Sequence, residues 1–287
     1  THAIGDRGNR ETLDVYAKAL GADAMGDHRW RIEHAQVLAP QDLPRLAAMH
    51  VIASMQPTHA TSDMPWAQDR VGPERIVGAY AWRQLRDSGA RLALGSDFPV
   101  ERVDPRLGLA SAVTRADADG LPAGGWYPNE KLTAYEALRG FTLDAAYAGF
   151  AEAEVGSLQA GKRADFVVLG EDPLAVPGEA LRALTVLAPY VDGQPQYDAT
   201  GEPSAATDRR HRDRAGQPQH GVGCVHGPAV APDLHPPAQE AQRGDAQEPQ
   251  AQGVACQPRA LLHGVMRAIS LPRPSPPGRA GSCSAPR

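Results

Sequence analysis

Short apolar runs alternate with amphipathic segments along the first half of the chain. The apolar runs at residues 51–55 and 91–95 are short enough to be buried strands, and residues 30–34, with apolar Trp30 and Ile32, are predicted to be a short strand as well. The amphipathic segments carry apolar side chains three and four residues apart, which predicts helices over residues 9–20, 41–49 and 72–89. Strand and helix alternate at roughly thirty residues per unit, the spacing of βα units. The pattern therefore predicts an α/β fold with a parallel sheet.

Local signals refine the boundaries of these elements. Asn9 is a residue type that caps helices, and Gly21 is the type that ends them. Pro44 is compatible with the second helix because it falls in the first turn. Residues 56–63 are polar and are predicted to form a loop, and the dipeptide at 72–73 (Gly-Pro) is predicted to open the third helix.

Further elements are predicted after residue 100. Residues 106–118 and 133–150 favour helices, and Thr133 with Glu136 has the spacing of a capping box. Residues 165–169 and 184–191 are rich in β-branched and apolar side chains and are predicted to be strands.

Composition divides the chain near residue 199. All phenylalanine, tryptophan, tyrosine and lysine residues lie at or before Tyr197, whereas the three cysteines and half of the 26 prolines lie after residue 200. A segment without aromatic side chains cannot bury enough surface to offset its chain entropy, so residues 200–287 are predicted to be a low-complexity, disordered tail. A shifted reading frame in a GC-rich gene would produce this bias, and we state it as a hypothesis that resequencing would test.

Charge and hydropathy exclude some classes of partner. The formal net charge of −5 argues against a nucleic-acid partner. No apolar run is long enough for a membrane span, and no signal-peptide pattern opens the sequence. The expected setting is cytoplasmic, with neither nucleic acid nor membrane as a partner.

Candidate chemistry is concentrated where strands are predicted to end. His2, His34, His59 and Asp97 each follow such a strand or lie in the loop after it. In a βα barrel, and equally in an open parallel sheet, side chains at the carboxyl ends of the strands share one site. Imidazole and carboxylate ligands together suit a borderline divalent metal, of which zinc is the first choice.

Other chemistries lack their sequence signals. No glycine-rich nucleotide-binding motif follows a strand, and no Gly-x-Ser-x-Gly motif is present. Any one of the four residues alone would be read as a turn, cap or core residue, and His28 and His50 are read as structural. The coincidence of several such residues at strand ends is what favours a metal site.

Five motifs taken together resemble the amidohydrolase superfamily, and in particular the group that includes the N-substituted formamide deformylases. They are THAIGD at residues 1–6, RIEHAQ at 31–36, SMQPTHATSD at 54–63, LGSDFP at 94–99 and EALRGFTLDAA at 136–146. The segment GSLQAGKRADFVVL at 156–169 resembles the strand return of the small β-domain in these enzymes. The resemblance covers about residues 1–199.

The resemblance implies a fold and a set of roles. It implies that residues 1–150 form strands five to eight of a metal-bearing (β/α)8 barrel, and residues 151–199 part of a small β-sandwich. By the same resemblance His2, His34 and Asp97 are metal ligands. Asp97 is also the proton shuttle for the attacking water, and His59 faces the substrate. The implied reaction is hydrolysis of a non-peptide carbon–nitrogen bond in a small amide or formamide.

The sequence departs from the family in one respect that bears on activity. The family pattern has a His-x-His pair at barrel strand one, and no His-x-His occurs in these 287 residues. We therefore expect an N-terminally truncated amidohydrolase. Two functions follow as hypotheses, a metal-dependent hydrolase and a catalytically inactive fragment. A third option is a half-barrel that closes itself as a homo-oligomer.

Overall fold

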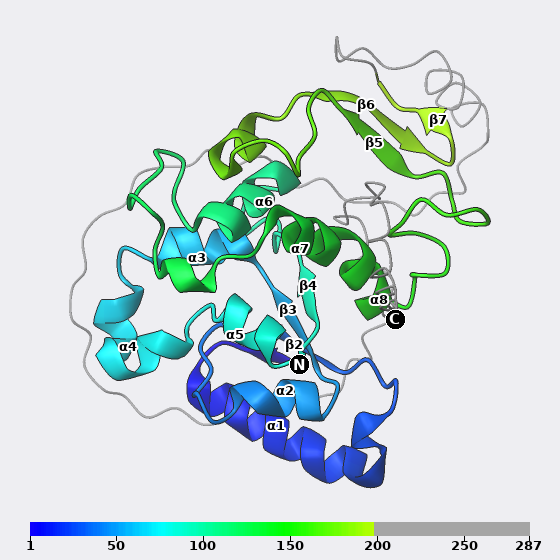
Figure 1. Ribbon diagram of the computed structural model, residues 1–287. Helices are drawn as coiled ribbons and strands as arrows, with labels where there is room; N and C mark the ends of the chain where they lie inside the picture. The colour runs from blue at the N-terminus through cyan, green and yellow to red at the C-terminus, as the bar shows by residue number, and fades with distance from the viewer. Residues whose placement is uncertain (198–287) are drawn as a thin grey trace, which may run out of the picture.

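Two sheets organise the structure, a computed structural model that describes residues 1–197. The predictions for residues 200–287 lie outside the described residues. A four-stranded parallel sheet occupies the centre of the molecule, and a three-stranded antiparallel sheet lies at the opposite end from α1 and α2 (Figure 1). The predicted α/β class with a parallel sheet is thus confirmed.

The parallel sheet has the strand order of the sequence. Its strands are β1 (His2–Ala3), β2 (Arg31–His34), β3 (Ile52–Met55) and β4 (Leu92–Leu94). Ala3 is in register with His34, and Met55 with Leu94, so neighbouring strands end at the same level. Because all four strands run in one direction, the residues that follow them come together at one edge of the sheet.

Helices packed on the sheet bury one of its faces. They include α1 (Asp6–Leu20), α2 (Leu43–Ala48) and α5 (Trp82–Asp87). Their fully buried leucines share one core cluster with apolar side chains of the strands: Leu13, Leu46 and Leu85 with Ile32, Ala53 and Leu92. Each buried side chain of this size contributes about 1.5–3 kcal/mol, so this face holds the sheet in place.

Three boundary predictions were wrong, each for a local reason. Helix α1 begins at Asp6, and Asn9 lies inside it, where its buried amide donates hydrogen bonds to the carbonyls of Gly5 and Val37. The predicted loop at 56–63 is mostly helix α3 (Pro57–Asp63), which starts with proline at its first position. The predicted helix over 72–89 is broken in its middle, because it passes through the 3-10 turn η2 (Ile76–Gly78) and Tyr80 has φ of 51°. Its predicted start agrees with the structure, since the non-helical Gly72 (φ of 78°) divides α4 (Ala67–Arg75) directly before Pro73.

Shorter elements connect these helices. The 3-10 turns are η1 (Gly21–Met25), η2 (Ile76–Gly78), η3 (Pro128–Glu130) and η5 (Gly178–Ala183). Helix α5 follows η2 after the break, so the chain reaches β4 through two short helices and not through one long helix.

The segment after β4 adds further helices against the sheet. It contains α6 (Pro105–Thr114), α7 (Ala134–Arg139), the π-helical turn η4 (Gly140–Asp144) and α8 (Ala145–Ala148). The capping box of Thr133 and Glu136 is confirmed at the start of α7. Asp144 is almost fully buried, and its carboxylate accepts hydrogen bonds from Arg91 at 2.5 Å and from Arg139 at 3.0 Å. This ion pair fixes η4 beside the start of β4.

The antiparallel sheet comprises β5 (Phe166–Leu169), β6 (Val186–Val191) and β7 (Gln194–Pro195). The rings of Phe166 and Tyr190 stack across β5 and β6 with centroids 4.4 Å apart. No helix within residues 1–197 is long and apolar enough to cross a membrane.

Candidate metal centre

Two candidate ligands, His34 and Asp97, lie at the carboxyl edge of the parallel sheet. His34 is the last residue of β2, and Asp97 follows β4 by three residues. Both have positive φ, 77° at His34 and 57° at Asp97. Left-handed backbone is uncommon outside glycine and is frequent at functional sites. The chain therefore turns sharply at both residues.

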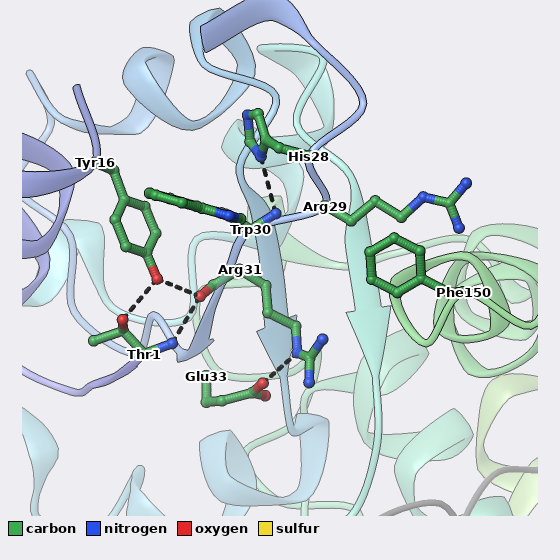
Figure 2. Close-up of a pocket in the computed structure, with 8 residues that line it drawn as sticks. All are labelled: Thr1, Tyr16, His28, Arg29, Trp30, Arg31, Glu33 and Phe150. Carbon is green, nitrogen blue, oxygen red and sulfur yellow. Dashed lines mark hydrogen bonds and ion pairs between the residues drawn. The ribbon is translucent and has the colours of Figure 1, made fainter. Parts of the chain in front are cut away.

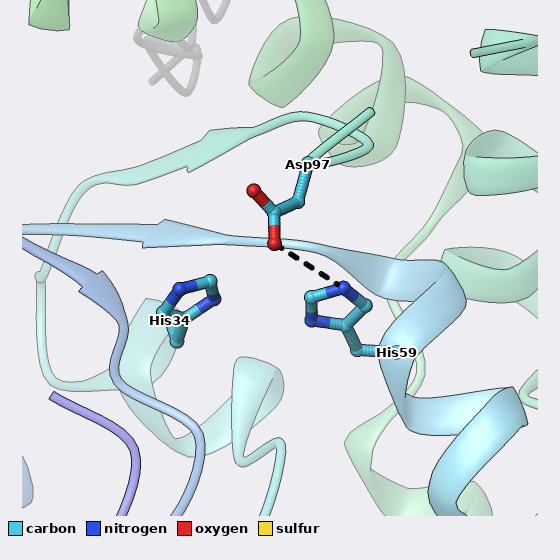
Figure 3. Close-up of side chains that lie close together, drawn as sticks. All are labelled: His34, His59 and Asp97. Atoms are coloured by element: carbon cyan, nitrogen blue, oxygen red, sulfur yellow. Dashed lines mark ion pairs between the residues drawn. The ribbon is translucent and has the colours of Figure 1, made fainter. Parts of the chain in front are cut away.

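The side chains of His34, His59 and Asp97 converge. One ligand atom from each lies within 4.8 Å of the other two. Figure 3 shows that the three side chains approach a common centre from different segments, with His59 carried by α3. The rings of His34 and His59 are stacked with centroids 5.7 Å apart. We call these three residues the metal-candidate cluster.

The nitrogen His59 Nε2 faces this centre without a hydrogen-bond partner. It is buried, and it lies 3.7 Å from Asp97 Oδ2, which is too long for a hydrogen bond. Burial lowers the pKa of His59 below its ordinary value. The ring is therefore neutral at pH 7, and a neutral imidazole has a lone pair for a metal.

The donor set fits a divalent metal. Two imidazoles and one carboxylate are ligands that zinc accepts. Two donors on one tetrahedral zinc are about 3.4 Å apart. The ligand atoms, which lie within 4.8 Å of one another, therefore have to approach by up to about 1.4 Å. The Asp97 side chain is 39% exposed and has room to rotate toward the two histidines.

His2 lies beside the cluster but is not one of its three members. Its ring contacts the ring of His34 edge-on, with centroids 4.4 Å apart, and its side chain is exposed on β1. The family resemblance implied that His2 is a metal ligand and that His59 faces the substrate. In the structure it is His59 that joins His34 and Asp97 within reach of one ion.

Helix α3 is held in place by a polar network that the sequence analysis missed. The carboxylate of Asp63 accepts a hydrogen bond from Gln36 Nε2 at 2.6 Å and another from the Tyr80 hydroxyl. Burial raises the pKa of Tyr80. Asp63 ends the helix that carries His59, so the network fixes His59 relative to the loop after His34. Residues four apart lie on one face of a helix, so Asp63 anchors the same face of α3 that carries His59. The polar run at 57–63 has no apolar period, so no signal in the sequence predicts this helix or the network.

A separate cavity of about 460 Å³ lies along β2 and the residues before it (Figure 2). No member of the metal-candidate cluster lines it. Its polar groups are largely paired with one another: Arg31 with Glu33, the Tyr16 hydroxyl with Thr1, and the Trp30 amide with His28. The cavity therefore lacks the unpaired polar groups that fix a ligand.

Comparisons with known proteins place the same residues in one family. A family model described as "Amidohydrolase family" matches residues 1–197. The chain is 39% identical over 197 residues to Protein LONG AFTER FAR-RED 3 of Arabidopsis thaliana, covering 68% of this chain and 33% of that protein. It is 32% identical over 204 residues to the N-substituted formamide deformylase of Arthrobacter pascens, covering 70% and 36%.

A solved structure agrees in fold. An uncharacterized metal-dependent hydrolase from Pyrococcus horikoshii OT3 superposes with a TM-score of 0.53 at 32% identity, covering 62% of this chain and 34% of that one. The chain spans about a third of the length of the curated relatives it matches. With the family match extending over all the described residues, this chain belongs to the amidohydrolase family.

Proposed function

We propose that this chain contributes to a metal-dependent hydrolase that cleaves carbon–nitrogen bonds in small amides or formamides. The observation that carries the proposal is the metal-candidate cluster at the carboxyl edge of the parallel sheet. Family membership supports a hydrolase, and the metal-dependent hydrolase that the chain resembles in fold supports a metal. The formamide bond type comes from the deformylase relative and from the motifs of the sequence.

We assign His34, His59 and Asp97 as donors to one divalent ion, with zinc as the first choice. His2 is the fourth candidate, because its ring contacts that of His34. A bound metal would lower the pKa of water to about 7 and polarise the substrate carbonyl. Asp97 would accept the proton of that water and return it to the leaving nitrogen, since its exposed carboxylate can contact both.

The proposed architecture follows the family. The four parallel strands would be strands five to eight of a (β/α)8 barrel, within residues 1–150. Residues 151–199, which include β5 and β6, would belong to a small β-domain. The remaining strands would come from elsewhere in the full-length protein or from a second copy of the chain.

The test is hydrolysis of N-formyl amines and simple amides by the purified full chain. We expect product release that stops when a chelator removes the metal and returns when zinc is added. No turnover in a folded, zinc-loaded chain would contradict the proposal. That result would favour the alternative, a catalytically inactive chain that has three donors but no His-x-His pair.

A further inference from the structure

Gln56 connects two members of the metal-candidate cluster. Its side-chain oxygen Oε1 lies 2.8 Å from His34 Nδ1, in a buried contact. Its backbone carbonyl accepts the amide hydrogen of His59 at 3.1 Å, at the start of α3. Gln56 is only 8% exposed, so water does not compete freely for its amide group.

The orientation of the Gln56 amide is determined by its second contact. Its Nε2 donates to the carbonyl of Ser54 at 3.4 Å. The flipped amide would place Oε1 against that carbonyl oxygen, and two acceptors repel each other. Oε1 therefore faces His34, and it can only accept a hydrogen bond.

This orientation determines which nitrogen of His34 can bind a metal. An acceptor at 2.8 Å requires that Nδ1 carries the hydrogen. In the neutral ring the lone pair is then on Nε2, the remaining donor atom. A second hydrogen-bonded group that fixes the tautomer and the ring plane is usual for histidines that bind metals.

We propose that Gln56 is a positioning residue that holds His34 in the Nδ1–H tautomer, with Nε2 directed to the metal. The inference rests on the proposed function for its metal. The contact between Gln56 and His34 stands independently of it. Gln56 does not touch the ion or the substrate in this role, and it acts only through the imidazole of His34.

The first test is the zinc dissociation constant of the full chain, measured by competition with a chromophoric chelator. Gln56→Met keeps the length of the side chain and removes the acceptor, and we expect it to weaken zinc binding about 10–100-fold. Gln56→Glu keeps an acceptor and should bind at least as tightly as the wild type. Gln68→Met, an exposed glutamine on α4, is the matched control and should leave the constant unchanged.

The second test is ¹⁵N NMR of the metal-free wild type at pH 8.5, where an ordinary imidazole is neutral. We expect a protonated Nδ1 and an unprotonated Nε2 at His34. An unprotonated Nδ1, or Gln56→Met binding zinc as tightly as the wild type, would overturn the inference. Failure of the wild type to bind zinc would instead refute the proposed function, and the NMR result would still decide the role of Gln56.

Discussion

His34→Ala is expected to weaken zinc binding by more than the roughly 10–100-fold that is typical for loss of an outer hydrogen-bonding partner. His34 is 9% exposed, at the end of β2, and the rings of both His2 and His59 contact it. Its removal eliminates a donor and leaves Gln56 without its buried partner. Isothermal titration of the metal-free full chain with zinc measures the effect.

The control for this variant is His50→Ala. His50 is an exposed histidine between α2 and β3, and it lies outside the metal-candidate cluster. We expect its zinc affinity to equal that of the wild type. If His34→Ala keeps wild-type affinity and a folded circular dichroism spectrum, the assignment of the metal to this edge of the sheet is wrong.

Asp97→Asn is expected to lower kcat by about 10²–10⁴-fold, the usual contribution of a positioned general base. The amide keeps an oxygen that can contact a metal, but it cannot accept the proton of the attacking water. Because the same substitution also removes a charge from the ion, zinc content is measured on the same sample. The rate is then compared at full zinc occupancy.

Asp69→Asn provides the matched control for charge. Asp69 is exposed on α4 and does not belong to the cluster, so its substitution should leave kcat unchanged. A zinc-saturated Asp97→Asn variant with the turnover of the wild type would show that another group moves the proton. In that case His59, 3.7 Å from Asp97, is the next residue to substitute.

The strands and their shared edge were predictable because buried strands leave a strong signal. Residues 51–55 and 91–95 are mostly apolar, residues 30–34 alternate apolar and polar side chains, and parallel strands end at one edge. That placed His34 and Asp97 near each other although 63 residues separate them in the chain. Their predicted role in metal binding stays a prediction.

Side-chain directions were not predictable in the same way. Residues 57–63 are polar without an apolar period, so the pattern could not reveal that they form a helix. Only that helix directs His59 to Asp97. The contact between Gln56 and His34 likewise depends on the register of β2 against β3, and register is a property of the folded sheet.

The backbone conformation of some single residues could not be predicted from the sequence either. Asn9 resembles a helix cap, yet tertiary contacts with Val37 draw it into the helix interior. Tyr80 has φ of 51° in the middle of the predicted helix over 72–89, and a pattern of apolar side chains does not reveal such a turn. Capping residues and the spacing of apolar side chains therefore predicted which helices and strands are present, but some of the predicted boundaries were wrong.

Anomalous diffraction at the zinc edge, from crystals of the full chain grown with zinc, tests the central claim most directly. We predict one zinc site with His34 Nε2 and an Asp97 carboxylate oxygen at about 2.0–2.2 Å. His59 Nε2 is expected as the third protein donor, which would distinguish it from His2. A zinc ion bound away from His34 and Asp97, or no bound zinc at all, would contradict the account.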